Sequence, residues 1–227
     1  MIELQNVSKY YGWGKDTKLV LHEVNCILDT SLSIGILGMN GAGKSTLINI
    51  IAGAMPPTKG KVVRKARISW PLGLKGFAGT FTGEENTRFI SRIYGADRRK
   101  VLKFVEEFSE LGDDLYRPIN TYSSGMKSRL TVAMSLAIEF DVYLMDEGLS
   151  VADKRFVNRY SAAMKERFTR SRVIMVSHSL KTLRDYCQHG AVLHHAKITE
   201  VMPIAQAAKL YDQVLSRPYE AAFNPNL

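Results

Sequence analysis

Eight consecutive residues near the start of the chain have the types and the spacing needed to bind a phosphate group. They match the pattern G-x-x-x-x-G-K-[ST] at every fixed position. Glycines allow several backbone N–H groups to point at one anion, the lysine adds a charge that reaches terminal phosphates, and the serine hydroxyl can coordinate Mg²⁺. We call these residues the phosphate loop: Gly38, Met39, Asn40, Gly41, Ala42, Gly43, Lys44 and Ser45, with Thr46 directly behind them.

The segments on either side of the phosphate loop support this interpretation. Residues 34–37 (Ile-Gly-Ile-Leu) form a short apolar run typical of a buried strand. Residues 44–52 carry apolar side chains at helical spacing, which predicts a helix whose positive dipole end faces the loop. A chance glycine-rich turn is the alternative, and the complete motif between a strand and a helix disfavours it.

Two further segments end in residues that could act on a bound phosphate. Residues 142–145 are apolar and are followed by Asp146 and Glu147, which predicts carboxylates at the carboxyl end of a buried strand, where parallel α/β sheets bind ligands. An ordinary surface loop is the alternative for such a pair. Residues 172–176 predict a third buried strand, which leads into Ser177 and His178. A lone histidine is more often structural than functional.

Composition sets limits on the class of protein. The chain has 227 residues, of which 45% are hydrophobic, which suits one large domain or a core with a subdomain. No run approaches the ~18 apolar residues of a spanning helix, and the N-terminus lacks the features of a signal peptide. Cys26 and Cys187 have no metal-like spacing, so we expect two reduced thiols.

The formal net charge of +9 points to anionic partners without selecting one. Basic residues cluster between residues 59 and 67 and again between residues 88 and 103. A positive surface can attract nucleic acid, anionic lipid or polyanionic ligands, and an ordinary solvated face is the alternative for each cluster.

The remaining patterns predict a sheet interrupted by a mostly helical insertion. We expect strands at residues 2–7 and 20–28 in a small antiparallel sheet, an aromatic turn at 9–14, and short strands at 61–63 and 67–70. Thr82 with Glu85 forms a capping box, and Asp97 can cap a second helix. Further predictions are a helix from about 122 to 139, one opened by Asp153 and ending near 168, one at 180–187, a hairpin at 191–199, and a last helix at 203–215.

The order of these elements resembles the ATP-binding cassette (ABC) family over nearly the whole chain. Five features fall in the order of the family: Tyr11, the phosphate loop, the segment Ser123-Ser124-Gly125, the pair Asp146-Glu147, and His178. The segment at 123–125 resembles the Leu-Ser-Gly-Gly-Gln signature of the family, with Tyr122, Ser124 and Met126 as departures.

This resemblance implies an α/β fold with three parts in one domain spanning residues 1–227. A RecA-like core with an N-terminal antiparallel β subdomain would comprise residues 1–81 and 141–215. An α-helical subdomain with the signature would comprise residues 82–140, and residues 216–227 would form a tail.

The resemblance also implies roles for individual residues. Tyr11 would stack on adenine, and the phosphate loop with Lys44 would hold the β- and γ-phosphates of ATP. Ser45 and Asp146 would hold Mg²⁺. Glu147 would act as general base on the attacking water, and His178 would contact the γ-phosphate.

The signature implies a homodimer with ATP at its interface. Ser123, Ser124 and Gly125 would bind the ATP held by a second copy of the chain, and Asp153 would cross the same interface. ATP binding would close the dimer and hydrolysis would open it.

One departure from the family concerns the loop after the strand at 67–70. The family usually has a glutamine there that touches Mg²⁺ and senses the membrane partner, whereas this chain has no glutamine between Gln5 and Gln188. The Ser-Trp-Pro sequence that begins this loop, the altered signature and the short C-terminus resemble ATPase subunits of bacterial capsular polysaccharide exporters. Related O-antigen exporters often carry an extra C-terminal carbohydrate-binding domain, for which the sequence leaves no room.

The main functional hypothesis is therefore the ATPase of an exporter that docks on a separate integral membrane permease at the cytoplasmic face of the bacterial inner membrane, with no nucleic acid as partner. A soluble ABC-type ATPase acting on nucleic acid or ribosomes is the alternative, although such relatives usually have long coiled-coil insertions or two cassettes. A phosphate-loop GTPase would need an Asn-Lys-x-Asp motif, which the sequence lacks. The presence of Glu147 and His178 argues against a module that binds nucleotide without hydrolysis.

Overall fold

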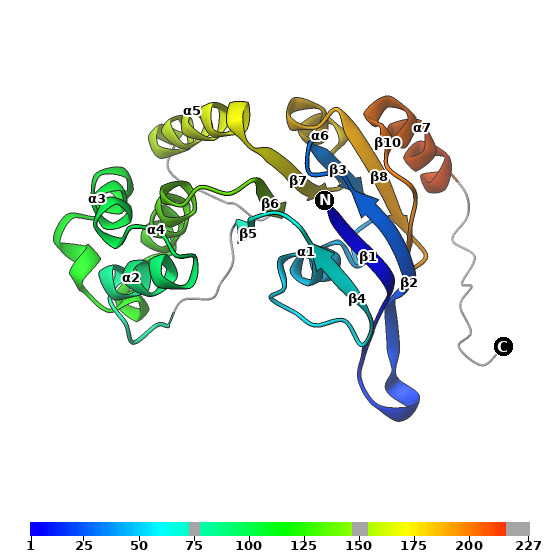
Figure 1. Cartoon of the computed structure of the whole chain (residues 1–227), viewed down its shortest axis with the longest axis horizontal. Coiled ribbons are helices and arrows are strands. Elements are labelled where there is room, and N and C mark those ends of the chain that lie inside the picture. Colours follow the sequence, from blue (N-terminus) through cyan, green and yellow to red (C-terminus); the bar gives the residue numbers. More distant parts are fainter. Residues whose placement is uncertain (73–77, 147–153, 217–227) are drawn as a thin grey trace. The chain divides into compact units, whose positions relative to one another are not determined.

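The computed structural model describes residues 1–72, 78–146 and 154–216 (Figure 1). The chain divides into two compact units. The first comprises residues 1–70, 142–147 and 172–227, and the second comprises residues 71–141 and 148–171.

An antiparallel sheet opens the first unit. Strands β1 (Ile2–Tyr11) and β2 (Lys18–Leu28) form a hairpin around the short 3-10 helix η1 (Gly14–Asp16), and β4 (Lys59–Arg64) pairs with the other edge of β1. The predicted aromatic turn at residues 9–14 is therefore wrong in part, because β1 continues through Tyr10 and Tyr11. Tyrosine favours strands, and these residues pair with Leu19 and Lys18 of β2.

A second, mostly parallel sheet forms the other half of this unit. Its strand order is β10-β8-β3-β7-β6-β5, and β9 pairs with β8. The strands are β3 (Ile34–Leu37), β5 (Ile68–Leu72), β6 (Val142–Asp146), β7 (Arg172–Ser177), β8 (His189–His194), β9 (Lys197–Ile198) and β10 (Met202–Pro203). Strand β3 runs parallel to β7 on one side and to β8 on the other, and β6 runs parallel to β7.

Helices cover both faces of the parallel sheet because successive strand residues point to opposite sides. On one face, Ile34 and Ile36 of β3 join the buried cluster that contains α1 (Lys44–Ala52). On the other face, Gly35 lies against Leu183 of α6 (Leu180–Tyr186), and Gly190 of β8 lies against α7 (Ile204–Leu215). This α/β arrangement confirms the predicted fold class.

Helix α1 is the element around which the first unit packs. Leu47, Ile48, Ile50 and Ile51 are fully buried, in one cluster with apolar side chains of both sheets. At the other end of the helix, Arg64 of β4 donates from Nε to the carbonyl of Ile51 (2.7 Å) and from Nη2 to that of Ile50 (2.6 Å). These bonds add donors at carbonyls of the last turn, where a helix end leaves the regular i+4 N–H donors missing.

The second unit is helical. Helices α2 (Gly83–Ile93), α3 (Arg98–Ser109), α4 (Ser124–Ala137) and α5 (Lys154–Arg170) pack in sequence order, with 3-10 helices η2 (Gly112–Tyr116) and η3 (Ile119–Thr121) before α4. The sequence-based boundary at residue 140 left the segment of α5 in the core. In the structure α5 joins this unit, where Arg159 donates to Glu110 and Arg167 donates to the carbonyl of Leu136.

Several local predictions are confirmed. Thr82 and Glu85 form the reciprocal capping box of α2, and the carboxylate of Asp97 accepts the backbone N–H groups of Arg99 and Lys100 at the start of α3. Cys26 and Cys187 are free and buried, and burial raises the pKa of these thiols to about 11 and about 12. The last helix begins at Ile204, because Pro203 belongs to the short strand β10.

Within the described ranges, no helix combines the length and the apolar character that crossing a bilayer requires.

The cap at Asp97 gives a prediction about pH. Hydrogen bonds from the backbone N–H groups of Lys100 and Arg99 lower the pKa of this carboxyl in the folded state. The ionised cap therefore adds stability above the unfolded pKa of about 4, and the addition is lost as the pH falls through the folded pKa. Asn caps a helix about as well but does not titrate. We expect the wild type to lose stability relative to Asp97→Asn between about pH 5 and about pH 3, measured by urea unfolding. A difference that stays constant with pH would contradict this role.

Candidate nucleotide-binding site

The phosphate loop connects β3 to α1 through two glycines in the left-handed region of φ. Gly41 has φ +80° and Gly43 has φ +99°, and Gly43 is the N-cap of α1. A Cβ atom on Gly43 would lie 2.7 Å from Cγ1 of Val20. A side chain at this position is therefore disfavoured both by the positive φ and by steric contact with Val20. The first turn of α1 contains no acidic residue, which leaves its N–H groups and dipole available to an anion.

Lys44 is folded back over the loop. Its Nζ donates to the carbonyl oxygens of Gly38 (2.7 Å) and Met39 (3.0 Å), and the residue is only 9% exposed. These bonds hold the ammonium group within the loop, on the side where the pocket opens. An ammonium group that donates to two carbonyl oxygens forms charge-assisted hydrogen bonds, which fix its position in the loop.

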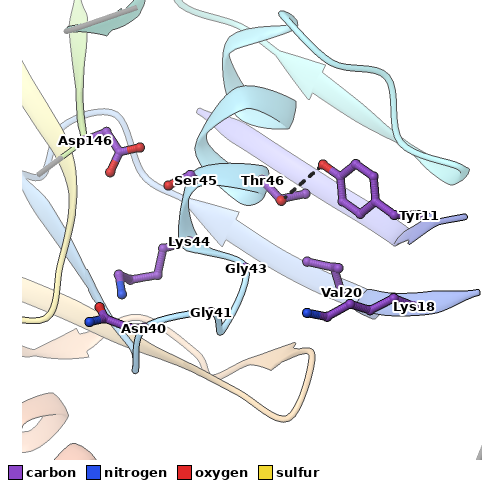
Figure 2. A pocket seen from close by; sticks show the side chains of 10 residues that line it. All are labelled: Tyr11, Lys18, Val20, Asn40, Gly41, Gly43, Lys44, Ser45, Thr46 and Asp146. Atoms are coloured by element: carbon purple, nitrogen blue, oxygen red, sulfur yellow. Dashed lines mark hydrogen bonds between the residues drawn. The ribbon is translucent and has the colours of Figure 1, made fainter. Parts of the chain in front are cut away.

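A pocket of about 440 Å³ opens beside the loop. Figure 2 shows the ten side chains and glycines around it. Eight of the predicted site residues meet here, together with Lys18 and Val20, which sequence reasoning missed. The lining residues are Tyr11, Lys18, Val20, Asn40, Gly41, Gly43, Lys44, Ser45, Thr46 and Asp146.

The register of the paired strands places Asp146 and His178 at the same edge of the parallel sheet as the phosphate loop. Leu37, the last residue of β3, pairs with Ser177 of β7, and Asp146 of β6 pairs with Val176. The strands β3, β6 and β7 therefore end at about the same level of the sheet. Gly38 follows β3, Asp146 is the last residue of β6, and His178 follows β7. Asp146 lines the pocket and is half-buried, whereas His178 is exposed.

Tyr11 forms the outer part of the pocket wall. Its hydroxyl lies 3.3 Å from Oγ1 of Thr46 and donates to Sδ of Met55 at 3.1 Å. The ammonium of Lys9 lies 5.5 Å from the ring centroid, and the tyrosine is 40% exposed. The hydroxyl contact with Thr46 fixes the ring beside the first turn of α1, and the exposed part of the ring is free to stack on a flat base.

The signature segment lies in the second unit. Ser123 is the N-cap of α4, and its hydroxyl accepts the N–H of Met126 (3.2 Å). Ser123 and Ser124 are exposed, Gly125 is half-buried, and the first turn of α4 carries no acidic residue. Tyr122, a departure from the family pattern, is buried and donates its hydroxyl to the carbonyl of Asp114 (2.5 Å). The change from Leu is thus absorbed by packing inside the unit.

Two predicted site residues, Glu147 and Asp153, lie outside the described residues, as do residues 73–77 of the loop that follows β5. Predictions about these positions stay predictions.

A strand, a glycine-rich turn with left-handed residues, a buried lysine and a strand-end carboxylate together define a phosphate-loop nucleotide-binding protein of the α/β class. Comparison with known proteins narrows this class. Residues 21–150 match the model of the family described as "ABC transporter".

Three curated relatives cover most of the chain. The capsule polysaccharide export ATP-binding protein CtrD of Neisseria meningitidis is 44% identical, over 94% of this chain and 100% of the relative. The ATP-binding protein BexA of Haemophilus influenzae is 44% identical over 94% and 99%. The polysialic acid transport ATP-binding protein KpsT of Escherichia coli is 41% identical over 87% and 90%. The chain belongs to the ABC transporter family, as its sequence predicts.

Solved structures agree on the fold. The ATP-binding cassette MJ0796, in a dimeric post-hydrolysis state bound to ADP and Pi, has a TM-score of 0.72 at 23% identity, over 90% of this chain and 99% of that one. An ATP-binding subunit of an ABC transporter has a TM-score of 0.72 at 19% identity, over 96% and 100%.

The two left-handed glycines of the loop give a matched pair of variants. Both Gly41→Ala and Gly43→Ala place a side chain at positive φ, which costs roughly 1–2 kcal/mol. A Cβ at Gly41 meets nothing within 4 Å, whereas one at Gly43 meets Val20. We expect Gly43→Ala to lower the unfolding free energy by roughly 1 kcal/mol or more beyond Gly41→Ala, measured by chemical unfolding without nucleotide.

Removal of the opposing methyl groups should recover part of this difference. In a double-mutant cycle, Val20→Ala should cost less in the Gly43→Ala background than in the wild type. Equal losses for the two glycine variants would mean that Val20 does not constrain the loop.

Proposed function

We propose that this chain is the ATP-hydrolysing subunit of an ABC exporter that moves a capsular polysaccharide across the bacterial inner membrane. The observation that carries the ATPase assignment is the pocket in which the phosphate loop, Tyr11 and Asp146 meet. It offers an aromatic ring at one end, which suits the adenine base of ATP, and a cluster of phosphate-binding groups at the other, which suits its phosphates.

The polysaccharide assignment comes from the relatives. Two of them are named for export of capsule polysaccharide or transport of polysialic acid, and each is covered over at least 90% of its length. The alternative of a soluble ATPase acting on nucleic acid or ribosomes finds no support among these relatives. We further propose that the chain works at the cytoplasmic face of the membrane, docked on an integral permease subunit.

In the nucleotide site, Tyr11 stacks on adenine and the loop binds the β- and γ-phosphates. Lys44 supplies the charge, and the backbone N–H groups at the start of α1 supply donors and dipole. Catalysis at such a site consists mostly of positioning and charge stabilisation. The proposed phosphate-binding residues are Gly38, Asn40, Gly41, Gly43, Lys44, Ser45 and Thr46.

The donor set of the pocket fits Mg²⁺. Ser45 and Asp146 both line the pocket and both offer oxygen, the ligand that Mg²⁺ prefers. Magnesium in nucleotide sites usually takes only one or two protein ligands and completes its shell with water and phosphate. Among the described residues no cluster of three or more His, Cys, Asp or Glu is arranged to hold a metal ion. Bound Mg²⁺ would neutralise phosphate charge.

The proposed hydrolytic residues are Glu147, which follows Asp146 at the end of β6, and His178, which follows β7. Glu147 acts as general base on the attacking water. His178 contacts the γ-phosphate from the neighbouring strand, a role that its level beside Gly38 in the parallel sheet supports.

We propose that two copies of the chain close on two ATP molecules. Ser123, Ser124 and Gly125 bind the γ-phosphate of the nucleotide held by the other copy, and Asp153 crosses the same interface. The support lies in the start of α4, where a capped helix with an acid-free first turn presents exposed serines. We retain the proposed organisation of residues 1–227 as one ABC ATPase domain.

The general base gives a prediction about turnover. Glu147→Gln should lower the ATP hydrolysis rate by about 100-fold or more, because removal of a positioned base typically costs 10²–10⁴. ATP binding should persist, so the variant should elute as an ATP-dependent dimer in size-exclusion chromatography. Glu166→Gln, an exposed position on α5, serves as the matched control and should behave as wild type. Rapid hydrolysis by the Glu147 variant would remove the residue from the mechanism.

The exported substrate gives a prediction in cells. In a strain that lacks this chain, the wild-type gene should restore polysaccharide at the cell surface, whereas Lys44→Ala should leave it inside the cell. Immunodetection of polysaccharide on intact cells and in lysates measures both. Normal surface polysaccharide without the chain would contradict the assigned substrate.

A further inference from the structure

Lys18 occupies a defined place in the wall of the nucleotide pocket. It pairs with Tyr11 in the last rung of the β1–β2 hairpin. Side chains directly opposite one another on antiparallel strands lie on the same face of the sheet. Both side chains line the pocket, and Figure 2 shows the Lys18 ammonium directed from β2 toward the phosphate loop.

The ammonium groups of Lys18 and Lys44 differ in their hydrogen-bond partners. The Lys44 ammonium already donates to two loop carbonyls, at Gly38 and Met39. Within the described part of the chain, Lys18 takes part in no ion pair and no side-chain hydrogen bond, and it is exposed to solvent. The pocket wall therefore holds a second cation that has no hydrogen-bond acceptor among the described residues.

The position of Lys18 along β2 indicates which part of a nucleotide it faces. Val20, the next residue on the same face, abuts Gly43 at the start of α1. Two strand residues span roughly 7 Å, so Lys18 lies about one such step along β2 from the loop, beside Tyr11, with which it pairs. With adenine on Tyr11 and the β- and γ-phosphates in the loop, the intervening part is the ribose and the α-phosphate.

We propose that Lys18 binds the α-phosphate of the nucleotide and so supplies a second charged contact outside the phosphate loop. The proposal rests on the nucleotide site proposed above and adds a specific residue to it. An ammonium group and a phosphate oxygen form a charge-assisted hydrogen bond, so the nucleotide would supply an acceptor for Lys18.

Three variants of the full chain test this contact. Lys18→Gln removes the charge and keeps much of the length, Lys18→Arg keeps the charge, and Lys61→Gln removes an exposed charge from β4 outside the pocket. We expect Lys18→Gln to weaken ATP and ADP binding alike by roughly 3- to 10-fold, as suits a partly exposed charged contact. Lys18→Arg and Lys61→Gln should stay within about twofold of wild type.

The salt dependence of binding separates a charge contact from a structural role. Screening weakens charged contacts as ionic strength rises. Titration calorimetry between about 50 and about 500 mM salt should therefore give a shallower decline of ATP affinity for Lys18→Gln than for wild type. A lysine that only protects a strand edge or packs against Tyr11 would not change this slope.

Two outcomes would overturn the assignment of Lys18. One is ATP affinity within twofold of wild type in Lys18→Gln, and the other is a loss of affinity with an unchanged salt slope. Lys44→Ala is measured in the same series. If Lys44→Ala weakens binding and Lys18→Gln does not, only the role of Lys18 fails; if neither does, the proposed nucleotide site itself fails.

Discussion

The first turn of α1 has to satisfy two opposite demands, and the rest of the first unit follows from them. Its N–H groups must remain open toward the pocket, while the helix behind them is buried between two sheets. The apolar side chains Leu47, Ile48, Ile50 and Ile51 anchor the helix in the common cluster. Burial on this scale is worth several kcal/mol, so it can hold the start of the helix in place beside the pocket. The left-handed Gly43, wedged against Val20, then turns the chain so that the loop curls around the pocket.

Much of this arrangement could be predicted from the sequence because its signals are local. The phosphate loop, the capping box of Thr82 and Glu85 and the cap at Asp97 are each encoded within a few residues, and their local patterns were enough to predict them. The buried strands β3, β6 and β7 are short apolar runs next to polar residues. The order of motifs along the chain indicated the family before any contact was known, and the strand order of the parallel sheet agrees with it.

What the sequence did not reveal depends on pairing between distant segments. Lys18 and Val20 enter the pocket because β2 pairs with an extended β1 and passes the start of α1, and neither residue belongs to a motif. The place of β4 beside β1 and the short strand β10 likewise depend on partners far along the chain. Helix α5 is a further example. Its hydrogen bonds through Arg159 and Arg167 place it in the second unit, and no local sequence pattern predicts these bonds.

Arg64 has a consequence for motion. Helix α1 is bounded by left-handed glycines at both ends, Gly43 and Gly53, and Arg64 ties its last carbonyls to strand β4. The helix therefore can neither lengthen by a turn nor slide along its axis without breaking these bonds. A force applied at its phosphate-binding end is transmitted to the antiparallel sheet at the far end. In mechanical terms, α1 links the phosphate loop at one end to strand β4 at the other.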